Sequence, residues 1–284
     1  MKYNLTIIGA GIAGLTAAAK AYASGLERVL LIEHQPVIGG FTRGYIETSF
    51  FETEQRLLSE CAALPYTIMT RSTVVGFFTG DGDTPHQLFV QTPTETEEIQ
   101  TDYILIASGA MEKPREAWRI SGGRPAGVMT PAMAVELSQR GYRLDEGKTM
   151  IYMADRRSHG AAEYLADRLG ETIQVSAEDF DIEHIHGTAQ LEGVTIRSVI
   201  TGEAERVNCS RLLFAKGRYG STFFLKGLPV ERDESTLCII TDRFGATGIP
   251  RVYAAGSCTQ LGDDGHTSSI EMASEVADHL LAKI

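Results

Sequence analysis

The chain has 284 residues, of which 26 are basic and 37 acidic, giving a formal net charge of -11. Nucleic acids and anionic membranes recruit Lys and Arg, so this acidity argues against both as partners. The length suffices for two modest domains, because one core usually serves about 100–200 residues. The apolar run over residues 5–19 is shorter than the ~20 residues that a membrane-spanning helix needs, so we expect a cytoplasmic protein.

Residues 2–33 have the pattern of a strand, a glycine turn, a helix and a second strand. The turn reads Gly9-Ala10-Gly11-Ile12-Ala13-Gly14. In a βαβ unit the first glycine permits the tight turn, the second lets a diphosphate approach the backbone, and the third lets helix and strand pack closely. Glu33 ends the second strand, 19 residues after Gly14, where an acid binds the adenosine ribose. A glycine turn without a ligand is the alternative, but strand, helix and acid together favour a nucleotide site.

The next segments extend this unit. Gly39-Gly40 would let the chain pass close to a long ligand, and Arg43 after them is as readily a phosphate ligand as a solvated surface arginine. Residues 50–63 predict a charged helix. From residue 66 onward, strands at 74–78, 88–91 and 101–106 predict a small antiparallel meander that returns to the sheet.

Cysteine and histidine spacing predicts neither a redox disulfide nor a metal site. The four cysteines contain no CxxC pair and are expected to be buried thiols: Cys61, Cys209, Cys238 and Cys258. His184 and His186 would share one face of a strand, but with no third ligand nearby no metal site is predicted.

Two later segments each predict a buried strand that ends in small residues. The first ends at Ala107-Ser108-Gly109 and the second at Gly256-Ser257. Together with the glycine turn, they resemble the FAD domain of the two-dinucleotide-binding-domain flavoproteins over essentially the whole chain. The resemblance implies an α/β fold, with a Rossmann-like FAD domain (parallel sheet plus antiparallel meander) at 1–116 and 246–284. Residues 117–245 would form an inserted domain of NAD(P)-binding type.

The resemblance also implies where FAD binds. The glycine turn would hold the diphosphate, the turn at 107–109 would close over the cofactor, and Gly256-Ser257 would stand where the family has Gly-Asp. A serine hydroxyl makes fewer hydrogen bonds than a carboxylate, so FAD binding is expected to be weaker or differently arranged. No catalytic side chain is singled out. The expected FAD contacts are Gly9, Ala10, Gly11, Ala13, Gly14, Glu33, His34, Gly40, Phe41, Thr42, Arg43, Val74, Ala107, Ser108, Gly109, Gly256, Ser257, Thr267 and Ser268.

The inserted domain departs from the family at its nucleotide turn. Residues 147–153 predict its first strand and residues 159–169 its helix. The turn lacks the second glycine fingerprint and reads Ala154-Asp155-Arg156-Arg157-Ser158-His159. We expect the fold to persist without the nucleotide, because a carboxylate and bulky side chains occupy the space of a diphosphate. The two arginines are the counter-argument, since a guanidinium can hold phosphate without glycines.

The resemblance narrows the chemistry further. Low-molecular-weight thioredoxin reductases share this length and layout, but the stretch corresponding to their CxxC, residues 127–134, contains no thiol. Residues 108–115 and 124–130 look more like the FAD-binding subunits of amine and opine dehydrogenases, sarcosine oxidase and hydrogen cyanide synthase. We therefore expect an FAD-dependent oxidoreductase that takes electrons from an organic, amine-like substrate or a partner subunit, within a homo- or hetero-oligomer.

Two alternatives remain open. One is an NAD(P)H-dependent flavin reductase of thioredoxin-reductase-like type. The other is a non-catalytic FAD-bearing subunit of a heteromeric dehydrogenase.

Overall fold

The computed structural model describes residues 2–40, 43, 51–153, 156–262 and 266–284. The chain forms two compact units. The first combines Met1–Arg43, Phe51–Met111 and Tyr219–Ile284, and the second includes Glu112–Arg218. These limits differ from the sequence-based boundaries at 116/117 and 245/246. The larger difference arises because residues 219–245 bury Leu225, Val230 and Ile239 in the core of the first unit.

The first unit is built on parallel strands in the order β3-β2-β1-β6, with β17 pairing the last part of β6. The first part of β6 pairs instead with β5 of an antiparallel meander formed with β4. The strands are β1 (Lys2–Ile8), β2 (Val29–Ile32), β3 (Thr67–Met69), β4 (Thr73–Phe78), β5 (His86–Gln91), β6 (Thr96–Ile106) and β17 (Val252–Ala254).

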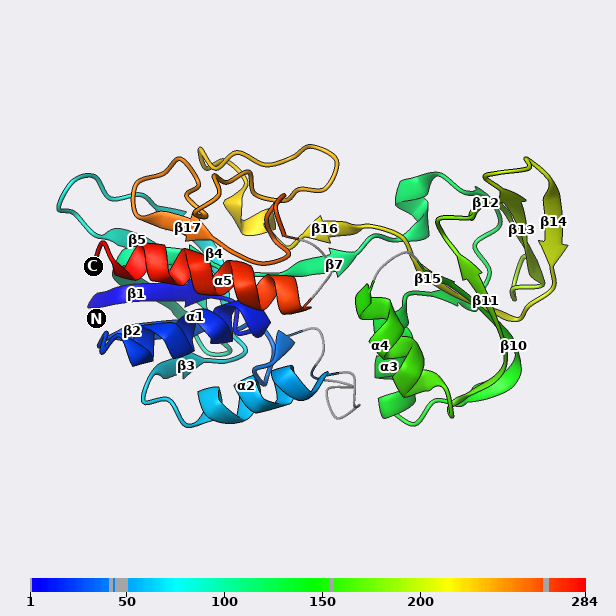
Figure 1. Cartoon of the computed structure of the whole chain (residues 1–284), viewed down its shortest axis with the longest axis horizontal. Helices are drawn as coiled ribbons and strands as arrows, with labels where there is room; N and C mark the ends of the chain where they lie inside the picture. The colour runs from blue at the N-terminus through cyan, green and yellow to red at the C-terminus, as the bar shows by residue number, and fades with distance from the viewer. Residues whose placement is uncertain (1, 41–42, 44–50, 154–155, 263–265) are drawn as a thin grey trace. The chain divides into compact units, whose positions relative to one another are not determined.

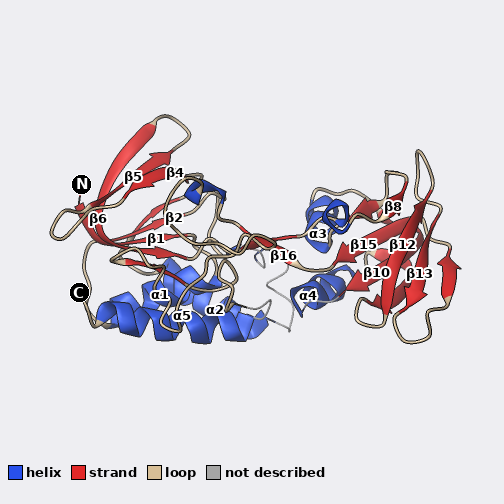
Figure 2. Cartoon of the chain, turned by 90° about the horizontal axis from the view of Figure 1, so that it is seen from above, coloured by secondary structure: helices blue, strands red, loops and turns tan. Residues whose placement is uncertain are grey.

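Helices cover one face of this sheet, as Figure 2 shows for α1 (Ile12–Ala23), α2 (Glu52–Ala62) and α5 (His266–Leu281). The first half of α1 is buried almost all round, because α1 packs on the sheet and also against α5. A helix without a polar stripe is stable only when it is enclosed in this way. The other face of the sheet packs against the meander and residues 219–245. The first unit therefore has three layers.

The second unit also has three layers. Its parallel sheet has the order β11-β10-β15-β9, and Figure 2 shows α3 (Pro131–Gln139) and α4 (Arg156–Leu165) on one face. A second sheet in the order β14-β13-β12-β8 packs on the other face around Tyr152, Val194 and Phe214. The strands are β8 (Ser121–Gly122), β9 (Val128–Met129), β10 (Leu144–Met153), β11 (Leu169–Ser176), β12 (Phe180–His186), β13 (Gly193–Ser198), β14 (Ala204–Val207) and β15 (Arg211–Ala215).

Short elements lie where the chain passes from one unit to the other (Figure 1). There β7 (Ala110–Glu112) and β16 (Arg218–Gly220) pair as a two-stranded sheet. The remaining elements are the 3-10 turns η3 (Arg115–Trp118) and η4 (Phe223–Leu225). The predicted α/β class, with a parallel sheet and an antiparallel meander, is confirmed. None of the helices in the described ranges combines the length and hydropathy needed to cross a bilayer.

Candidate cofactor site

Three of the segments singled out in the sequence follow strands that end at one edge of the first unit's parallel sheet. The glycine turn follows β1, the turn Ala107-Ser108-Gly109 follows β6, and Gly256-Ser257 lies just beyond β17. Backbone hydrogen bonds hold the first two side by side, since Ala107 N donates to Ile8 O at 2.8 Å. Open α/β sheets bind their ligands at this carboxyl edge.

Gly9 and Gly14 are required by the packing of the protein itself. A Cβ on Gly9 would lie 2.3 Å from the carbonyl oxygen of Ala107, and its φ of +105° is one that favours glycine. A Cβ on Gly14 would lie 1.9 Å from the carbonyl oxygen of Gly9. Gly9 therefore allows the turn and Gly14 the close start of α1.

Gly11 is different, because protein packing does not demand a glycine there. Among the described residues beyond its chain neighbours, a Cβ on Gly11 would approach only the Cα of Gly40, at an ordinary 3.7 Å. Gly11 is also the N-cap of α1, and it provides no side chain to cap the helix. An uncapped helix start offers free N–H groups and a partial positive charge. The turn thus fits an anion such as the FAD diphosphate.

Glu33 is buried beside this turn and is tied to it. Its Oε2 accepts a hydrogen bond from Ala10 N and its Oε1 one from Gln35 N, both at 2.8 Å, and His34 Nδ1 lies 2.9 Å from Oε1. Burial opposes ionisation, but the accepted hydrogen bonds outweigh it and hold the pKa of Glu33 below its usual value. The hydrogen bond to Glu33 raises the pKa of His34. The ionised carboxylate retains acceptor capacity for a ribose hydroxyl.

The Gly39-Gly40 pair runs directly across the glycine turn. Gly39 N donates to Ala10 O at 2.8 Å, and a Cβ on Gly40 would lie 2.8 Å from the Cα of Gly11. Arg43 follows with its Nη1 buried and without a hydrogen-bond partner among the described residues. Leaving a buried donor unpaired costs about 1–3 kcal/mol, which a phosphate oxygen would offset. This favours the phosphate interpretation of Arg43 over the solvated one.

The turn after β17 packs on the start of α1. Gly256 has φ +80°, and a Cβ there would lie 2.7 Å from the Cβ of Ala13. The buried Thr259 Oγ1 donates to Gly256 O and accepts from Gly262 N, both at 2.9 Å. Sequence reasoning missed Thr259, although a threonine shortly after a glycine is a known side-chain-to-backbone turn signal. Ser257 is half-buried beside this braced turn.

The remaining residues expected to contact FAD differ in how far they are exposed. Ser108 and Gly109 are half-buried at the end of β6, and at the start of α5 Thr267 is exposed and Ser268 half-buried. Val74 lies on β4 of the meander, and its side chain is only 2% exposed in the core of the first unit. Phe41 and Thr42 lie outside the described residues.

The corresponding turn of the second unit is shorter than that of the first. Two residues, Ala154 and Asp155, separate β10 from α4, and both lie outside the described residues. Three residues, two of them glycines, separate β1 from α1.

All four cysteines are buried and free. Burial raises the pKa of Cys61, Cys209 and Cys258 to about 11 each. A thiol with such a pKa forms almost no thiolate near neutral pH and is a poor nucleophile. These three thiols are therefore poorly suited to disulfide exchange, and the fourth, Cys238, is buried.

Comparison with known proteins agrees with this geometry. The family model for pyridine nucleotide-disulphide oxidoreductases matches residues 122–277, and a model for NAD(P)-binding Rossmann-like domains matches residues 7–53. A thioredoxin reductase of Treponema pallidum is 25% identical, over 89% of this chain and 88% of its own length. One subunit of the opine oxidase of Agrobacterium tumefaciens is 28% identical, over 46% of this chain and 29% of its own length.

Solved structures share the fold. The thioredoxin reductase of Lactococcus lactis superposes with a TM-score of 0.71 at 20% identity, covering 99% of this chain and 100% of its own. L-proline dehydrogenase from P. horikoshii also gives 0.71, at 17% identity, covering 100% of this chain and 56% of its own.

Proposed function

Since this chain belongs to the pyridine nucleotide-disulphide oxidoreductase family and is an FAD-dependent oxidoreductase, we propose that its electrons come from an organic, amine-like substrate or a partner subunit rather than from NADH or NADPH. FAD, when bound, supplies two-electron hydride chemistry. The first unit would be its FAD-binding domain, and the second an inserted domain of NAD(P)-binding type without its nucleotide.

The observation that carries this proposal is the difference between the two βα connections. A dinucleotide diphosphate needs glycines for close backbone approach and free N–H groups at the helix start. The first unit offers both at Gly11. The connection from β10 to α4 is one residue shorter, contains no glycine and includes Asp155, a carboxylate that repels phosphate. The second connection therefore supports no NAD(P)H site of the usual design.

The chain also lacks the residues that would reduce a disulfide substrate at the position where thioredoxin reductases have them. The segment corresponding to the redox CxxC of thioredoxin reductases begins α3 here, where Thr130 Oγ1 accepts a hydrogen bond from Met133 N and Pro131 takes the first helical position. Neither residue can exchange with a disulfide. An organic substrate or partner chain then remains as the electron source.

The protein's own part is to bind and orient the cofactor. We propose that Glu33 accepts a hydrogen bond from a ribose hydroxyl and that Gly11 and Arg43 hold the diphosphate. The start of α5 would face the flavin. A helix N-terminus carries partial positive charge, which would stabilise an anionic reduced ring.

Some of the similar proteins support this proposal, and others support a second candidate function, an NAD(P)H-dependent flavin reductase. The opine oxidase and the L-proline dehydrogenase act, by their names, on amine-containing compounds, which supports an amine-like substrate. The relatives named thioredoxin reductase align over most of this chain, which favours an NAD(P)H-dependent flavin reductase.

Anaerobic reduction of the FAD-loaded protein separates the two candidates. We expect excess NADH and then NADPH to leave the flavin absorbance unchanged, while one member of a panel of secondary amines, amino acids and opines bleaches it. Dithionite serves as the control that the bound flavin can be reduced. Rapid bleaching by either nicotinamide nucleotide would reject the proposal in favour of the reductase.

A further inference from the structure

Two histidines lie side by side on the outer sheet of the second unit. His184 and His186 are alternate residues of β12, both are half-buried, and their ring centroids are 4.6 Å apart. Neighbouring strands hold both rings: His184 Nδ1 lies 2.9 Å from Ser121 Oγ on β8, and His186 Nε2 lies 2.7 Å from Thr195 Oγ1 on β13.

The hydrogen bonds around Ser121 determine the tautomer of His184. The Ser121 hydroxyl donates its proton to the carbonyl oxygen of Glu183, at 2.6 Å. Ser121 Oγ must therefore accept from His184 Nδ1, so that in the neutral ring Nε2 carries the free lone pair. Metal-binding histidines have this arrangement, in which one nitrogen is fixed by an outer hydrogen bond and the other is left to coordinate. In the tautomer whose Nε2–H donates to Thr195 Oγ1, His186 keeps the lone pair of Nδ1 for coordination.

The separation of the rings matches two imidazoles on one metal ion. With a metal–nitrogen distance of about 2.1 Å, each ring centroid lies about 3.2 Å from the metal. Two such rings at right angles have centroids about 4.5 Å apart, and at a tetrahedral angle about 5.2 Å apart. When both free nitrogens face one ion, the observed 4.6 Å is compatible with the right-angle arrangement. Right angles between ligands are typical of tetragonal and square-planar ions.

We propose that His184 and His186 form a site for a divalent transition metal of tetragonal preference, Cu(II) or Ni(II). Clusters of three or more His, Cys, Asp or Glu suited to a metal do not occur among the described residues, so water completes the coordination shell. Imidazole suits both ions, and Cu(II) binds such sites more tightly than Ni(II). This proposal departs from the expectation, drawn from the missing third ligand, that this histidine pair binds no metal.

Arg206 provides a means of testing the charge of the ligand. It pairs with Thr195 in the ladder, and its Nε lies 3.4 Å from the position of a Cβ on Gly193, the residue opposite His186. A guanidinium there repels a metal cation and attracts an anion. Removing its charge should tighten metal binding about two- to fivefold in dilute buffer, because the repulsion acts mainly through water and is partly screened.

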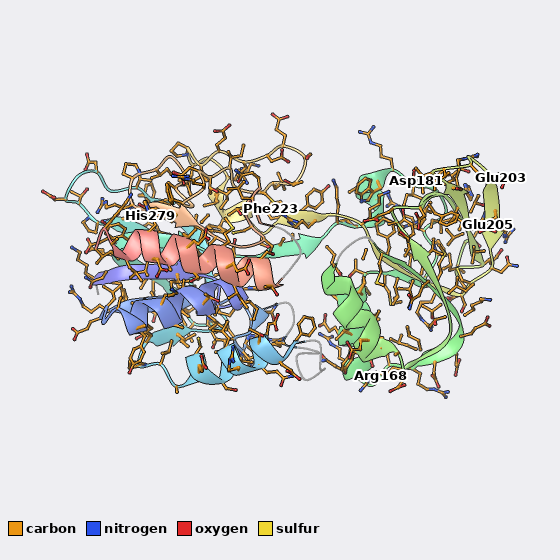
Figure 3. The ribbon with its side chains drawn as sticks, in the orientation of Figure 1. Arg168, Asp181, Glu203, Glu205, Phe223 and His279 are labelled. Atoms are coloured by element: carbon orange, nitrogen blue, oxygen red, sulfur yellow. The ribbon has the colours of Figure 1, made fainter. Side chains whose placement is uncertain are left out.

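The experiment is a titration of the untagged, FAD-loaded protein with CuCl2 and, separately, NiCl2, followed by calorimetry, with electron paramagnetic resonance for Cu(II). We expect one ion per chain, nitrogen hyperfine structure from two imidazoles, and Cu(II) bound more tightly than Ni(II). His184→Gln and His186→Gln should each weaken binding about 10- to 100-fold. Arg206→Gln should tighten it. His279→Gln is the matched control, since His279 lies on α5 of the first unit (Figure 3) and is stacked on Phe244.

Three results would overturn the proposal. They are affinity equal in wild type and both β12 variants, a spectrum with one nitrogen ligand, and a site that prefers inorganic phosphate and loses it in Arg206→Gln. The last would identify an anion site instead. Circular dichroism of each variant verifies its folding, and flavin reduction tests the electron source separately.

Discussion

At the scale of single residues, Gly11 and its neighbouring glycines have separable roles. Gly11→Ala adds a Cβ that the described protein atoms accommodate, at 3.7 Å, so we expect the apoprotein to unfold at nearly the wild-type temperature. The same Cβ stands where a diphosphate must approach, so FAD affinity should fall at least about tenfold. The flavin-to-protein ratio after gel filtration and the melting temperature together measure both effects. Gly76→Ala, with open space around it, is the control. Unchanged flavin retention in Gly11→Ala would disprove this role.

Arg43 permits a second test at this scale. Its Nη1 is buried without a partner among the described residues, so removing the charge should lower FAD affinity without destabilising the apoprotein. We expect Arg43→Gln to weaken FAD binding about 10-fold or more, in line with the 1.5–3 kcal/mol typical of hydrogen bonds to charged groups. Arg56→Gln, at an exposed position on α2, is the control. Equal FAD affinities in the two variants would contradict a phosphate contact.

Individual residues were predictable where the backbone dictated them. At Gly9 and Gly14 a Cβ would lie within 2.3 Å of a backbone oxygen, so only glycine fits. This requirement produces the glycine spacing by which the turn is recognised in the sequence. The burial of the Val74 side chain was not predictable in this way, because nothing in the sequence showed that this side chain faces the core. The engagement of Glu33 by Ala10 N was also not apparent, since it depends on how the two strands meet.

At the scale of elements, His86 makes the free energy of unfolding depend on pH through its contact with the turn between β4 and β5. It is fully buried, and its Nδ1 accepts from Gly80 N at 3.0 Å. Burial lowers the pKa of His86 from 6.5 to about 4, and the charge of Arg251 acts in the same direction. Between these values the unfolded chain binds the additional proton, so the free energy of unfolding rises with pH across this window and is level above it. We expect a loss of about 1–3 kcal/mol between pH 7 and pH 4.

Urea denaturation of the apoprotein at several pH values measures this loss. His86→Gln should remove that part of the pH dependence, because the amide oxygen can accept from Gly80 N but does not titrate in this range. His279→Gln should retain it. A pH profile that is the same in His86→Gln and wild type would show that other groups are responsible.

Elements were predictable where periodicity and end signals agreed. After a polar loop, the sequence predicts a last helix over about residues 267–282, and the structure has it at His266–Leu281. The helix of the second unit, predicted over residues 159–169, is observed at Arg156–Leu165, so it begins two residues after β10. The helix α3 was not predicted, although Thr130 before Pro131 is a strong N-terminal signal. With only 9 residues, α3 has too short a periodic pattern to stand out.

At the scale of the whole molecule, the sequence indicated one discontinuous domain with a second domain inserted into it, but not the limits between them. Residues 219–245 lack a long periodic element that would assign them, and only their buried side chains, such as Val230 and Ile239, show that they pack with the first unit. Long-range packing of this kind has no local pattern in the sequence.

Our proposal assigns the FAD site to the first unit and no nucleotide site to the second. It therefore predicts which unit each ligand stabilises against unfolding. We propose that FAD binds only the folded first unit, so in calorimetry FAD at 100 times its Kd should stabilise that unit by about 2.7 kcal/mol. NADH and NADPH should shift no transition, because the connection from β10 to α4 contains no glycine. Val194→Ala, in the core of the second unit, identifies the other transition by lowering it about 1–3 kcal/mol while leaving the FAD shift intact. A transition raised by NADPH and lowered by Val194→Ala would show instead that the second unit has kept its nucleotide.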